Sequence, residues 1–384
     1  MRMKYLIAAL GGFQFGYAIG IMAGIILFLA SGFHLSPHEQ ALLASVSLVG
    51  ALPGALIAGP LSNRLGRRRS QQSIGVFFLI GSLILFFAQP ISTILLGRFL
   101  QGLAIGAIAV VAPMYIAEIS PQERRGHFVS FYQLAVTIGI LVAYILNLLL
   151  EPHWEWIFGL GAIPALIHVI GFQFLPDSLH HEHLRPRWRG IPVKPLLITI
   201  FLNIFQQITG INAIIYFAPT IFLNAGFETP LLALMPPILV ASVNICFTYV
   251  ALLLLDCWGR RPLLLTGTAA MALSLLLLTS AFVTTAKWLA VTSTLLYTAG
   301  FALGLGPIPQ LVTSEIFPQK YRGYGMSVGL VLNWIFNFIV VFTFLELSTR
   351  FSHAFTFGIY AFFAFLALYL SWKYLPETRG KTID

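Results

Sequence analysis

Charged residues are scarce in this sequence. Asp, Glu, Lys and Arg make up 9% of its 384 residues, whereas hydrophobic residues make up 58% and the mean hydropathy is +0.88. A soluble domain carries about 25% charged residues, which cover its water-exposed surface. This chain has too few for that, so its composition excludes a soluble globular protein and indicates an integral membrane protein.

Cysteine is also rare, and only Cys246 and Cys257 are present. Both lie in one predicted helix, where the rise per residue separates them by about 16 Å, too far for a disulfide. No spacing of His, Cys, Asp or Glu indicates a metal site, and no nucleophilic triad appears. We therefore expect no metal, no cofactor and no membrane enzyme.

Long apolar runs occupy most of the chain. Crossing a hydrocarbon core of about 30 Å takes roughly 20 apolar residues in a helix. By that criterion we predict about twelve helical spans. They lie at 6–32, 41–62, 71–90, 92–117, 127–150, 155–175, 193–225, 230–255, 262–282, 288–314, 324–346 and 352–375. The first resembles a signal peptide but is too long for one, so an uncleaved first helix is expected.

The net charge of +9 follows the predicted topology. Lys and Arg concentrate in alternate loops, and the opposite loops contain only Lys287 and Arg350. This positive-inside pattern predicts that both termini are cytoplasmic, and the charge indicates no nucleic-acid partner. The basic loops and tails contain Arg2, Lys4, Arg64, Arg67, Arg68, Arg69, Arg124, Arg125, Arg185, Arg187, Arg189, Lys194, Arg260, Arg261, Lys320, Arg322, Lys373, Arg379 and Lys381.

The two halves of the sequence repeat each other. GPLSNRLGRRR (59–69) is echoed by LLLLDCWGRRP (252–262), and APMYIAEISPQERRG (112–126) by GPIPQLVTSEIFPQKYRG (306–323). We predict an N-terminal six-helix bundle at 1–176, a short cytoplasmic linker at 177–192 and a C-terminal six-helix bundle at 193–384. Parallel repeats of this kind are typical of alternating-access transporters, whose substrate site lies between the halves.

Several motifs give the chain a resemblance to the sugar porters of the major facilitator superfamily. They are GRFLQG (97–102), PMYIAEISPQERRG (113–126), QQITGIN (206–212), DCWGRRP (256–262), GPIPQLVTSEIFPQKYRG (306–323), NWIFNF (333–338) and PETRG (376–380). The resemblance covers essentially the whole chain. It implies an all-α integral membrane protein with the major facilitator fold, twelve transmembrane helices in two pseudo-symmetric bundles. It also implies transport of a monosaccharide, most readily a glucose-like hexose, by alternating access.

Polar side chains interrupt the apolar segment FQQITGIN (205–212). Gly210 allows the helix to unwind, and broken helices occur at membrane depth where they meet protein or a water-filled cavity. Amides both donate and accept hydrogen bonds, as sugar hydroxyls do. The resemblance implies that a sugar site is lined by Gln133, Gln206, Gln207, Asn212, Asn244, Asn333 and Trp334. The alternative is that such amides only join helices, and for Asn337 the two roles stay open.

The resemblance also implies gates on both sides of the site. Tyr216 and Phe217 match an external aromatic gate, although packing is the alternative for Phe217. Pro307 and Pro309 each remove a backbone donor and weaken the tenth span, which the family uses as a flexible gate.

Matching charges recur at the cytoplasmic end of each half. An arginine pair faces a glutamate at the end of another span, and an acidic residue follows the last span. Carboxylates and guanidinium groups form bidentate pairs, which in the family lock the outward-facing state; anchoring the topology is the alternative role. The set consists of Arg67, Arg68, Glu118, Arg125 and Asp177 in the first half and Arg260, Arg261, Glu315, Arg322 and Glu377 in the second.

Ala18 departs from the family pattern, because proton-coupled sugar porters carry an Asp at this place in the first span. Alanine cannot gain or lose a proton, so we predict a uniporter that carries out facilitated diffusion. The alternatives are a proton-coupled sugar or polyol symporter and a non-transporting sugar sensor. Arg98 is then a charge within a span that lacks this Asp, and it is expected to bond to carbonyls or to amides such as Gln14.

Two further departures concern specificity and location. Gln310 stands where most members have Trp, which leaves the choice among hexose, pentose and inositol open. The linker after the first half is short, which favours a multi-pass protein of the bacterial inner membrane. The sugar and the lipid bilayer are the expected partners, and the sequence predicts no oligomeric state.

Overall fold

The structure is a computed structural model that describes residues 3–88, 90–120, 125–177 and 190–379. Within these ranges the chain is built of helices, and no strand occurs. Twelve helical segments there are long and apolar enough to cross a membrane. The predicted all-α fold with twelve spans is therefore confirmed, and the span boundaries agree with the predicted ones to within a few residues.

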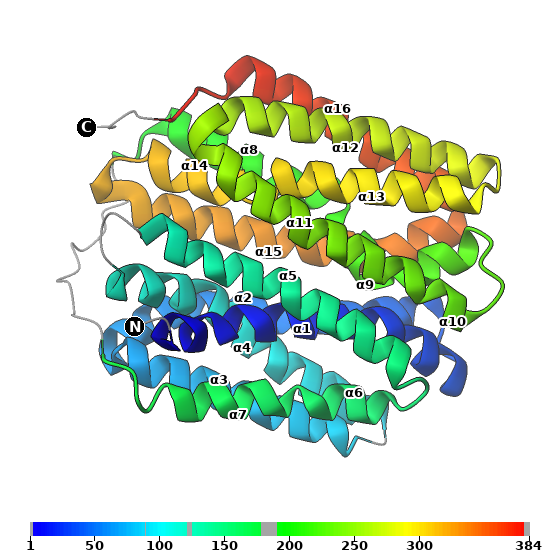
Figure 1. Cartoon of the computed structure of the whole chain (residues 1–384), viewed down its shortest axis with the longest axis horizontal. Coiled ribbons are helices and arrows are strands. Elements are labelled where there is room, and N and C mark those ends of the chain that lie inside the picture. The colour runs from blue at the N-terminus through cyan, green and yellow to red at the C-terminus, as the bar shows by residue number, and fades with distance from the viewer. Residues whose placement is uncertain (1–2, 89, 121–124, 178–189, 380–384) are drawn as a thin grey trace. The chain divides into compact units, whose positions relative to one another are not determined.

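The chain forms two compact units. Unit 1 comprises Met1–His181 together with Ile215–Pro219, and unit 2 comprises Glu182–Ile214 and Thr220–Asp384. Each unit contains six of the membrane-spanning segments, coloured from blue to green in unit 1 and from green to red in unit 2 (Figure 1).

Unit 1 contains four long spans, a fifth that starts within the charged motif, and a sixth made of two short helices. They are α1 (Met3–Gly32), α2 (Pro37–Leu65), α3 (Arg67–Phe86), α4 (Ile91–Ile119), α5 (Arg125–Leu149), α6 (Trp154–Leu160) and α7 (Ala162–Gly171).

Unit 2 contains three spans that are divided into two helices each. Two of these breaks, between α8 and α9 and between α13 and α14, were expected from Gly210 and from the prolines of the tenth span. The helices are α8 (Val193–Ile208), α9 (Ile211–Asn224), α10 (Pro230–Ala233), α11 (Met235–Trp258), α12 (Arg260–Val283), α13 (Lys287–Leu303), α14 (Ile308–Ile316), α15 (Gln319–Arg350) and α16 (His353–Tyr374).

Glycines hold α1 closely against α5 in unit 1. They recur at every fourth position of α1, and a Cβ atom on any of them would collide with α5. Small residues at this spacing allow transmembrane helices to approach until their backbones touch. The stripe consists of Gly12, Gly16, Gly20 and Gly24.

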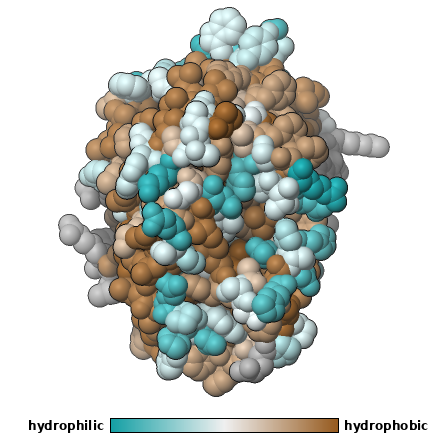
Figure 2. Space-filling model, turned by 90° about the vertical axis from the view of Figure 1, so that its right-hand side faces the viewer, coloured by the Kyte–Doolittle hydropathy of each residue, from teal (hydrophilic) through white to brown (hydrophobic). Residues whose placement is uncertain are grey.

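The two ends of the helices differ in composition. We call the end at which α3 and α12 begin the basic end of each unit, because the arginine pairs lie there. At the opposite end, hydrophilic and hydrophobic residues are intermixed over the surface (Figure 2). That mixture is expected of loops and helix ends that leave the hydrocarbon.

Candidate functional site

The seventh span breaks at Gly210. Helix α8 ends at Ile208, Gly210 adopts a left-handed conformation with φ +94°, and α9 begins at the next residue. The Thr209 carbonyl at the break accepts a hydrogen bond from the Tyr297 hydroxyl, 2.9 Å away. A residue of α13 thus pairs with the carbonyl that the break leaves open. Gln207 before the break and Asn212 after it lie within hydrogen-bonding distance of each other.

Four amides around this break form one continuous chain of hydrogen bonds within unit 2. Asn212 Nδ2 donates to Gln207 Oε1 at 2.6 Å, and Gln207 Nε2 donates to Asn333 Oδ1 at 3.0 Å. Asn333 Nδ2 donates in turn to Gln206 Oε1 at 2.5 Å. All four side chains are buried or half-buried. The chain joins α8, α9 and α15 at membrane depth and leaves the buried amides paired rather than exposed to lipid.

The amide chain ends on the second helix break. Gln206 Nε2 donates to the carbonyls of Leu305 and Gly306, at 2.6 and 2.9 Å, in the gap between α13 and α14. Both carbonyls lie outside α13 and α14, and the Leu305 carbonyl has no helical donor because the residue four positions later, Pro309, lacks an N–H. The sequence analysis did not anticipate this contact, although the run GLGP (304–307) contains the residues that break the helix.

The other predicted sugar-binding residues do not take part in this chain of amide hydrogen bonds. Asn244 on α11 accepts a bond of 3.4 Å from Thr248 of its own helix. Trp334 is buried beside Asn333 on α15, and Gln310 on α14 is exposed. Gln133 is half-buried on α5 of unit 1. Among the described residues, no hydrogen bond links Asn244, Gln310 or Gln133 to the amide chain.

The predicted aromatic gate residues are fully buried. Tyr216 and Phe217 lie on α9, in the segment that groups with unit 1. The helix is distorted at Phe217, with φ −118° and ψ 17°. Pro219 cannot donate to the Ile215 carbonyl four residues earlier, and the Tyr144 hydroxyl donates to that carbonyl instead, at 2.8 Å. The distortion therefore has an identifiable cause and a compensating bond.

Replacing Gly210 by alanine is expected to destabilise the protein strongly. The left-handed conformation costs about 1–2 kcal/mol for a residue with a Cβ. That Cβ would also lie 2.6 Å from Tyr360 Cε2, which adds an overpacking cost of about 1–3 kcal/mol. Thermal unfolding of the variant in detergent measures the combined loss of stability from these two costs.

Two alanine variants separate the strain from the clash. Gly226 has φ +106° and open space around its Cβ position, so Gly226→Ala should show only the smaller loss from strain. Gly358 has neither feature, and Gly358→Ala should show no loss. Equal melting temperatures for all three variants would contradict this account of the break.

In each unit, the described residues include a half-buried ion pair at the basic end. In unit 1, Arg67 Nε lies 3.1 Å from Glu118 Oε1. In unit 2, Arg260 Nη2 lies 2.8 Å from Glu315 Oε1, and its Nε donates to both carboxylate oxygens at 3.2 Å. The second arginine of each pair, Arg68 or Arg261, contacts an acidic residue through its backbone N–H group instead. The side chains of Arg125 and Arg322, also predicted to join the network, lie outside what the structure describes.

The acidic residue after the last span of each unit caps a helix. In unit 1, Asp177 Oδ1 accepts from the backbone N–H of Arg68 at 3.2 Å, at the start of α3. In unit 2, Glu377 accepts from the backbone N–H groups of Arg260 and Arg261, both at 3.0 Å, at the start of α12. A carboxylate at a helix N-terminus satisfies unpaired N–H groups and the positive end of the helix dipole.

The caps explain the glycine before each arginine pair. Gly66 and Gly259 precede the two helices with φ +86° and +92°. A Cβ on either would lie 2.7 Å from an oxygen of the capping carboxylate, Asp177 or Glu377. Only glycine fits both the conformation and the close approach.

Acid should weaken the Glu377 cap. Partial burial raises the pKa of its carboxyl, but the backbone N–H groups of Arg379, Arg260, Arg261 and Thr378 outweigh this, and the net pKa lies below the usual range. A lowered pKa stabilises the folded state fully above the ordinary glutamate pKa, and this stabilisation is lost as the pH falls through the folded-state value. Glu377→Gln should therefore cost up to about 1 kcal/mol near neutral pH, and the difference from wild type should shrink in acid.

Melting temperatures of both proteins across a pH series measure this effect. Glu346→Gln, which removes an exposed carboxylate paired with Arg350, is the control and should have little effect. A constant difference between Glu377→Gln and wild type down to the most acidic pH would exclude a charge-dependent cap.

Arg98 is fully buried within unit 1 and joins three helices. Its Nη1 donates to the Ala18 carbonyl at 2.9 Å and to Gln101 Oε1 at 3.1 Å, and its Nη2 donates to Ser47 at 2.9 Å. Gln101 Nε2 then donates to Ser82 on α3 at 3.0 Å. Among the described residues no carboxylate forms an ion pair with Arg98. The expected bond to a carbonyl is present, whereas Gln14 is buried without a bond to the guanidinium.

Comparison with known proteins identifies the family. The sequence profile described as "Sugar (and other) transporter" matches residues 4–185 and 179–384. The chain belongs to the sugar porter family of the major facilitator superfamily. This sugar porter is 32% identical to the galactose-proton symporter of Escherichia coli (strain K12), over 98% of this chain and 92% of that protein.

Other relatives and solved structures agree. This sugar porter is 31% identical to the glucose transporter GlcP of Staphylococcus epidermidis, over 99% of this chain and 96% of that protein. It superposes on the crystal structure of a D-xylose-proton symporter with a TM-score of 0.87 at 30% identity, covering 99% of both chains. The chain is thus a multi-pass membrane protein and a sugar transporter of the major facilitator superfamily, and neither its relatives nor its fold are those of an enzyme.

Proposed function

We propose that this sugar porter moves a monosaccharide, most readily a glucose-like hexose, by alternating access. The observation that carries the proposal is the amide chain of Gln206, Gln207, Asn212 and Asn333. A sugar hydroxyl can replace any amide in such a chain, because it too donates and accepts. The chain is uncharged, so the sugar is held by exchangeable bonds and can leave again.

The remaining predicted contacts belong to the same proposal. Trp334 lies next to Asn333 in sequence and offers an aromatic face for the apolar face of a pyranose. Asn244, Gln310 and Gln133 stay proposed sugar contacts. Tyr216, Phe217, Pro307 and Pro309 stay proposed gate residues.

We further propose that transport is facilitated diffusion. Ala18 is fully buried and cannot titrate, and its carbonyl bonds to Arg98. Symport needs a group that takes up and releases a proton in each cycle. The guanidinium of arginine is too basic to release its proton in such a cycle, so Arg98 cannot serve as that group.

Proton-coupled symport is the alternative. Two of its relatives, from Escherichia coli, are proton symporters by name, one for galactose and one for D-xylose. If this protein shares their coupling, a different carboxylate must supply the proton site.

We place the protein in the cell membrane with both termini in the cytoplasm, on the distribution of Lys and Arg. The ion pairs Arg67–Glu118 and Arg260–Glu315, with the caps on α3 and α12, then lie on the cytoplasmic side, and we propose that they lock the outward-facing state.

Counterflow of radiolabelled sugars in proteoliposomes tests the function. We expect glucose or a related hexose to exchange, with no acidification of the lumen as net uptake proceeds. Absence of counterflow across a panel of hexoses, pentoses and polyols would refute sugar transport. Uptake accompanied by acidification would refute uniport only.

A further inference from the structure

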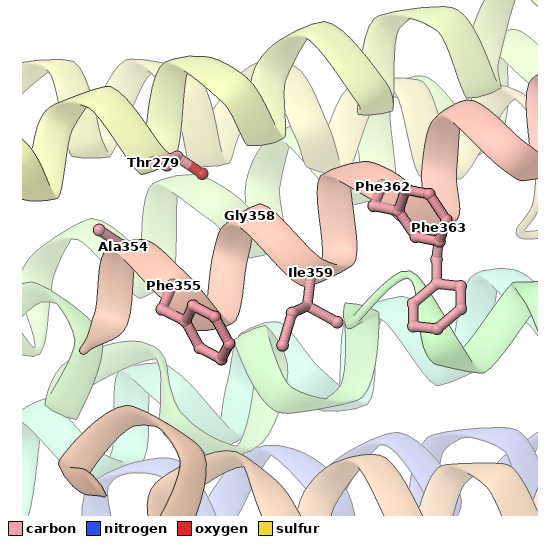
Figure 3. Close-up of a pocket in the computed structure, with 7 residues that line it drawn as sticks. All are labelled: Thr279, Ala354, Phe355, Gly358, Ile359, Phe362 and Phe363. Carbon is pink, nitrogen blue, oxygen red and sulfur yellow. The ribbon is translucent and has the colours of Figure 1, made fainter. Parts of the chain in front are cut away.

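Two open apolar pockets follow the contact between α12 and α16 in unit 2, and we call them together the groove. One part, of about 500 Å³, lies between Thr279 of α12 and the first turns of α16 (Figure 3). A second part, of about 580 Å³, lies nearer the basic end, between Ala269 of α12 and Trp372 of α16. The two helices run side by side along the edge of the unit (Figure 1).

One face of α16 lines both parts of the groove. Phe355, Phe362, Phe365, Tyr369 and Trp372 recur on it at intervals of three, four or seven residues, which places them on one side of a helix. Each is at least 40% exposed. Figure 3 shows Phe355, Ile359 and Phe363 projecting from one side of α16 in the first part of the groove.

The groove is open because small residues form part of its lining. A Cβ on Gly358 would have no atom within 4 Å. Both helices are membrane-spanning segments. At this depth the neighbouring medium is hydrocarbon, so an acyl chain has the chemistry to fill the groove.

Positive charge collects where the groove reaches the basic end. Arg261 Nη2 donates to the Trp372 carbonyl at 2.7 Å, which places the guanidinium at the end of the aromatic face. Lys373 Nζ lies 5.8 and 5.2 Å from the ring centres of Tyr369 and Tyr374.

These cations are not neutralised within the described part of the chain. No described carboxylate forms an ion pair with Arg261 or Lys373. The nearby Glu377 directs its oxygens at backbone N–H groups of Arg260 and Arg261. The Arg261 Nε atom is buried and has no hydrogen-bond partner among the described residues.

We propose that this groove binds an anionic phospholipid. One acyl chain lies along the aromatic face of α16, and the phosphodiester group contacts Arg261 and Lys373. Guanidinium and ammonium groups form charge-assisted hydrogen bonds with phosphate oxygens, and basic pockets beside membrane helices favour anionic headgroups. Tyr369, Trp372 and Tyr374 are the amphipathic aromatic residues expected at the level of the headgroups. The bound lipid ties the end of α16 to the start of α12, whatever solute the protein carries.

Lipid titration of the purified full-length protein in detergent tests the proposal. Phosphatidylglycerol and phosphatidylcholine with identical acyl chains are added separately, and the melting temperature is recorded. Phosphatidylglycerol should raise the melting temperature at lower concentrations than phosphatidylcholine does. Soluble glycerol phosphate should leave the melting temperature unchanged. In Lys373→Gln, the half-maximal phosphatidylglycerol concentration should rise roughly fivefold, since one basic side chain near an anionic lipid contributes about that much.

Two further variants make the test specific. Lys287→Gln removes a lysine that also lies over an aromatic ring, 5.9 Å from Phe227, at the start of α13, and should keep the wild-type response. Gly358→Leu fills the groove at a position with free space, so it should fold and should weaken the phosphatidylglycerol effect. Equal effects of the two lipids on wild type would overturn the proposal. So would wild-type responses in both Lys373→Gln and Gly358→Leu.

Discussion

Replacing Gln207 by alanine is expected to lower the affinity for sugar by about 5- to 150-fold. The substitution removes the oxygen that accepts a hydrogen bond from Asn212 and the NH₂ group that donates one to Asn333. If Gln207 bonds to the sugar, the substitution also leaves a buried sugar hydroxyl without its partner. That costs about 1–3 kcal/mol, and each 1.4 kcal/mol is a factor of ten in binding. Sugar binding is measured by calorimetry on the purified protein and by the concentration dependence of counterflow.

The control for this variant is an amide on the same helix as Asn212. Asn224 is exposed and bonds only locally, through a donation to the Thr220 carbonyl. Asn224→Ala should bind sugar as wild type does. If Gln207→Ala lowers the melting temperature but keeps the wild-type affinity for sugar, the amide chain joins helices and does not bind the sugar.

Replacing Ala18 by aspartate is expected to couple transport to protons. Position 18 is fully buried, and its carbonyl bonds to Arg98 at 2.9 Å. A carboxylate there would lie near the guanidinium and could alternate between the charged and the protonated form. With one proton per sugar, each pH unit across the membrane supports about tenfold accumulation. Wild type should only equilibrate the sugar under the same gradient.

Ala18→Asn has nearly the same shape as Ala18→Asp and cannot titrate, so it controls for steric effects and should equilibrate. Accumulation is measured in proteoliposomes with an imposed pH difference. Accumulation by wild type would refute uniport. An active Ala18→Asp protein that still only equilibrates would show that position 18 alone does not confer coupling.

The membrane spans could be predicted because the hydrocarbon core restricts the choice. A segment of suitable length and apolarity must form a helix there, since its backbone has no other partners. The break at Gly210 was predictable for a related reason, because glycine tolerates a left-handed conformation that other residues avoid.

The partners at the site could not be predicted in the same way. Gln206 bonds to Leu305 and Gly306 some 100 residues later, and those carbonyls are available only because a second helix is interrupted. A sequence motif identifies side chains, whereas these acceptors are backbone carbonyls. They can be identified only once the structure shows that the two helix breaks lie side by side.

The arginine pairs are a second case in which the sequence did not predict the hydrogen-bond partners. The sequence predicts that both arginines of each pair take part in ion pairs. The structure shows Arg67 and Arg260 in that role, whereas the described contacts of Arg68 and Arg261 with the last acidic residue come from their backbone N–H groups. Asp177 and Glu377 lie at helix N-termini, where backbone N–H groups have no partner within the helix and a carboxylate can accept from them.

The carbonyls of Leu305 and Gly306 also set a direction for the whole amide chain. A carbonyl can only accept, so Gln206 must turn its NH₂ group toward them and its oxygen toward Asn333. The same reasoning passes through Gln207 and leaves the Asn212 oxygen as the free acceptor end. No amide in the row can be flipped alone. Two main-chain oxygens in the tenth span thereby fix a hydrogen-bond acceptor, the Asn212 oxygen, at the far end of the row in the seventh span.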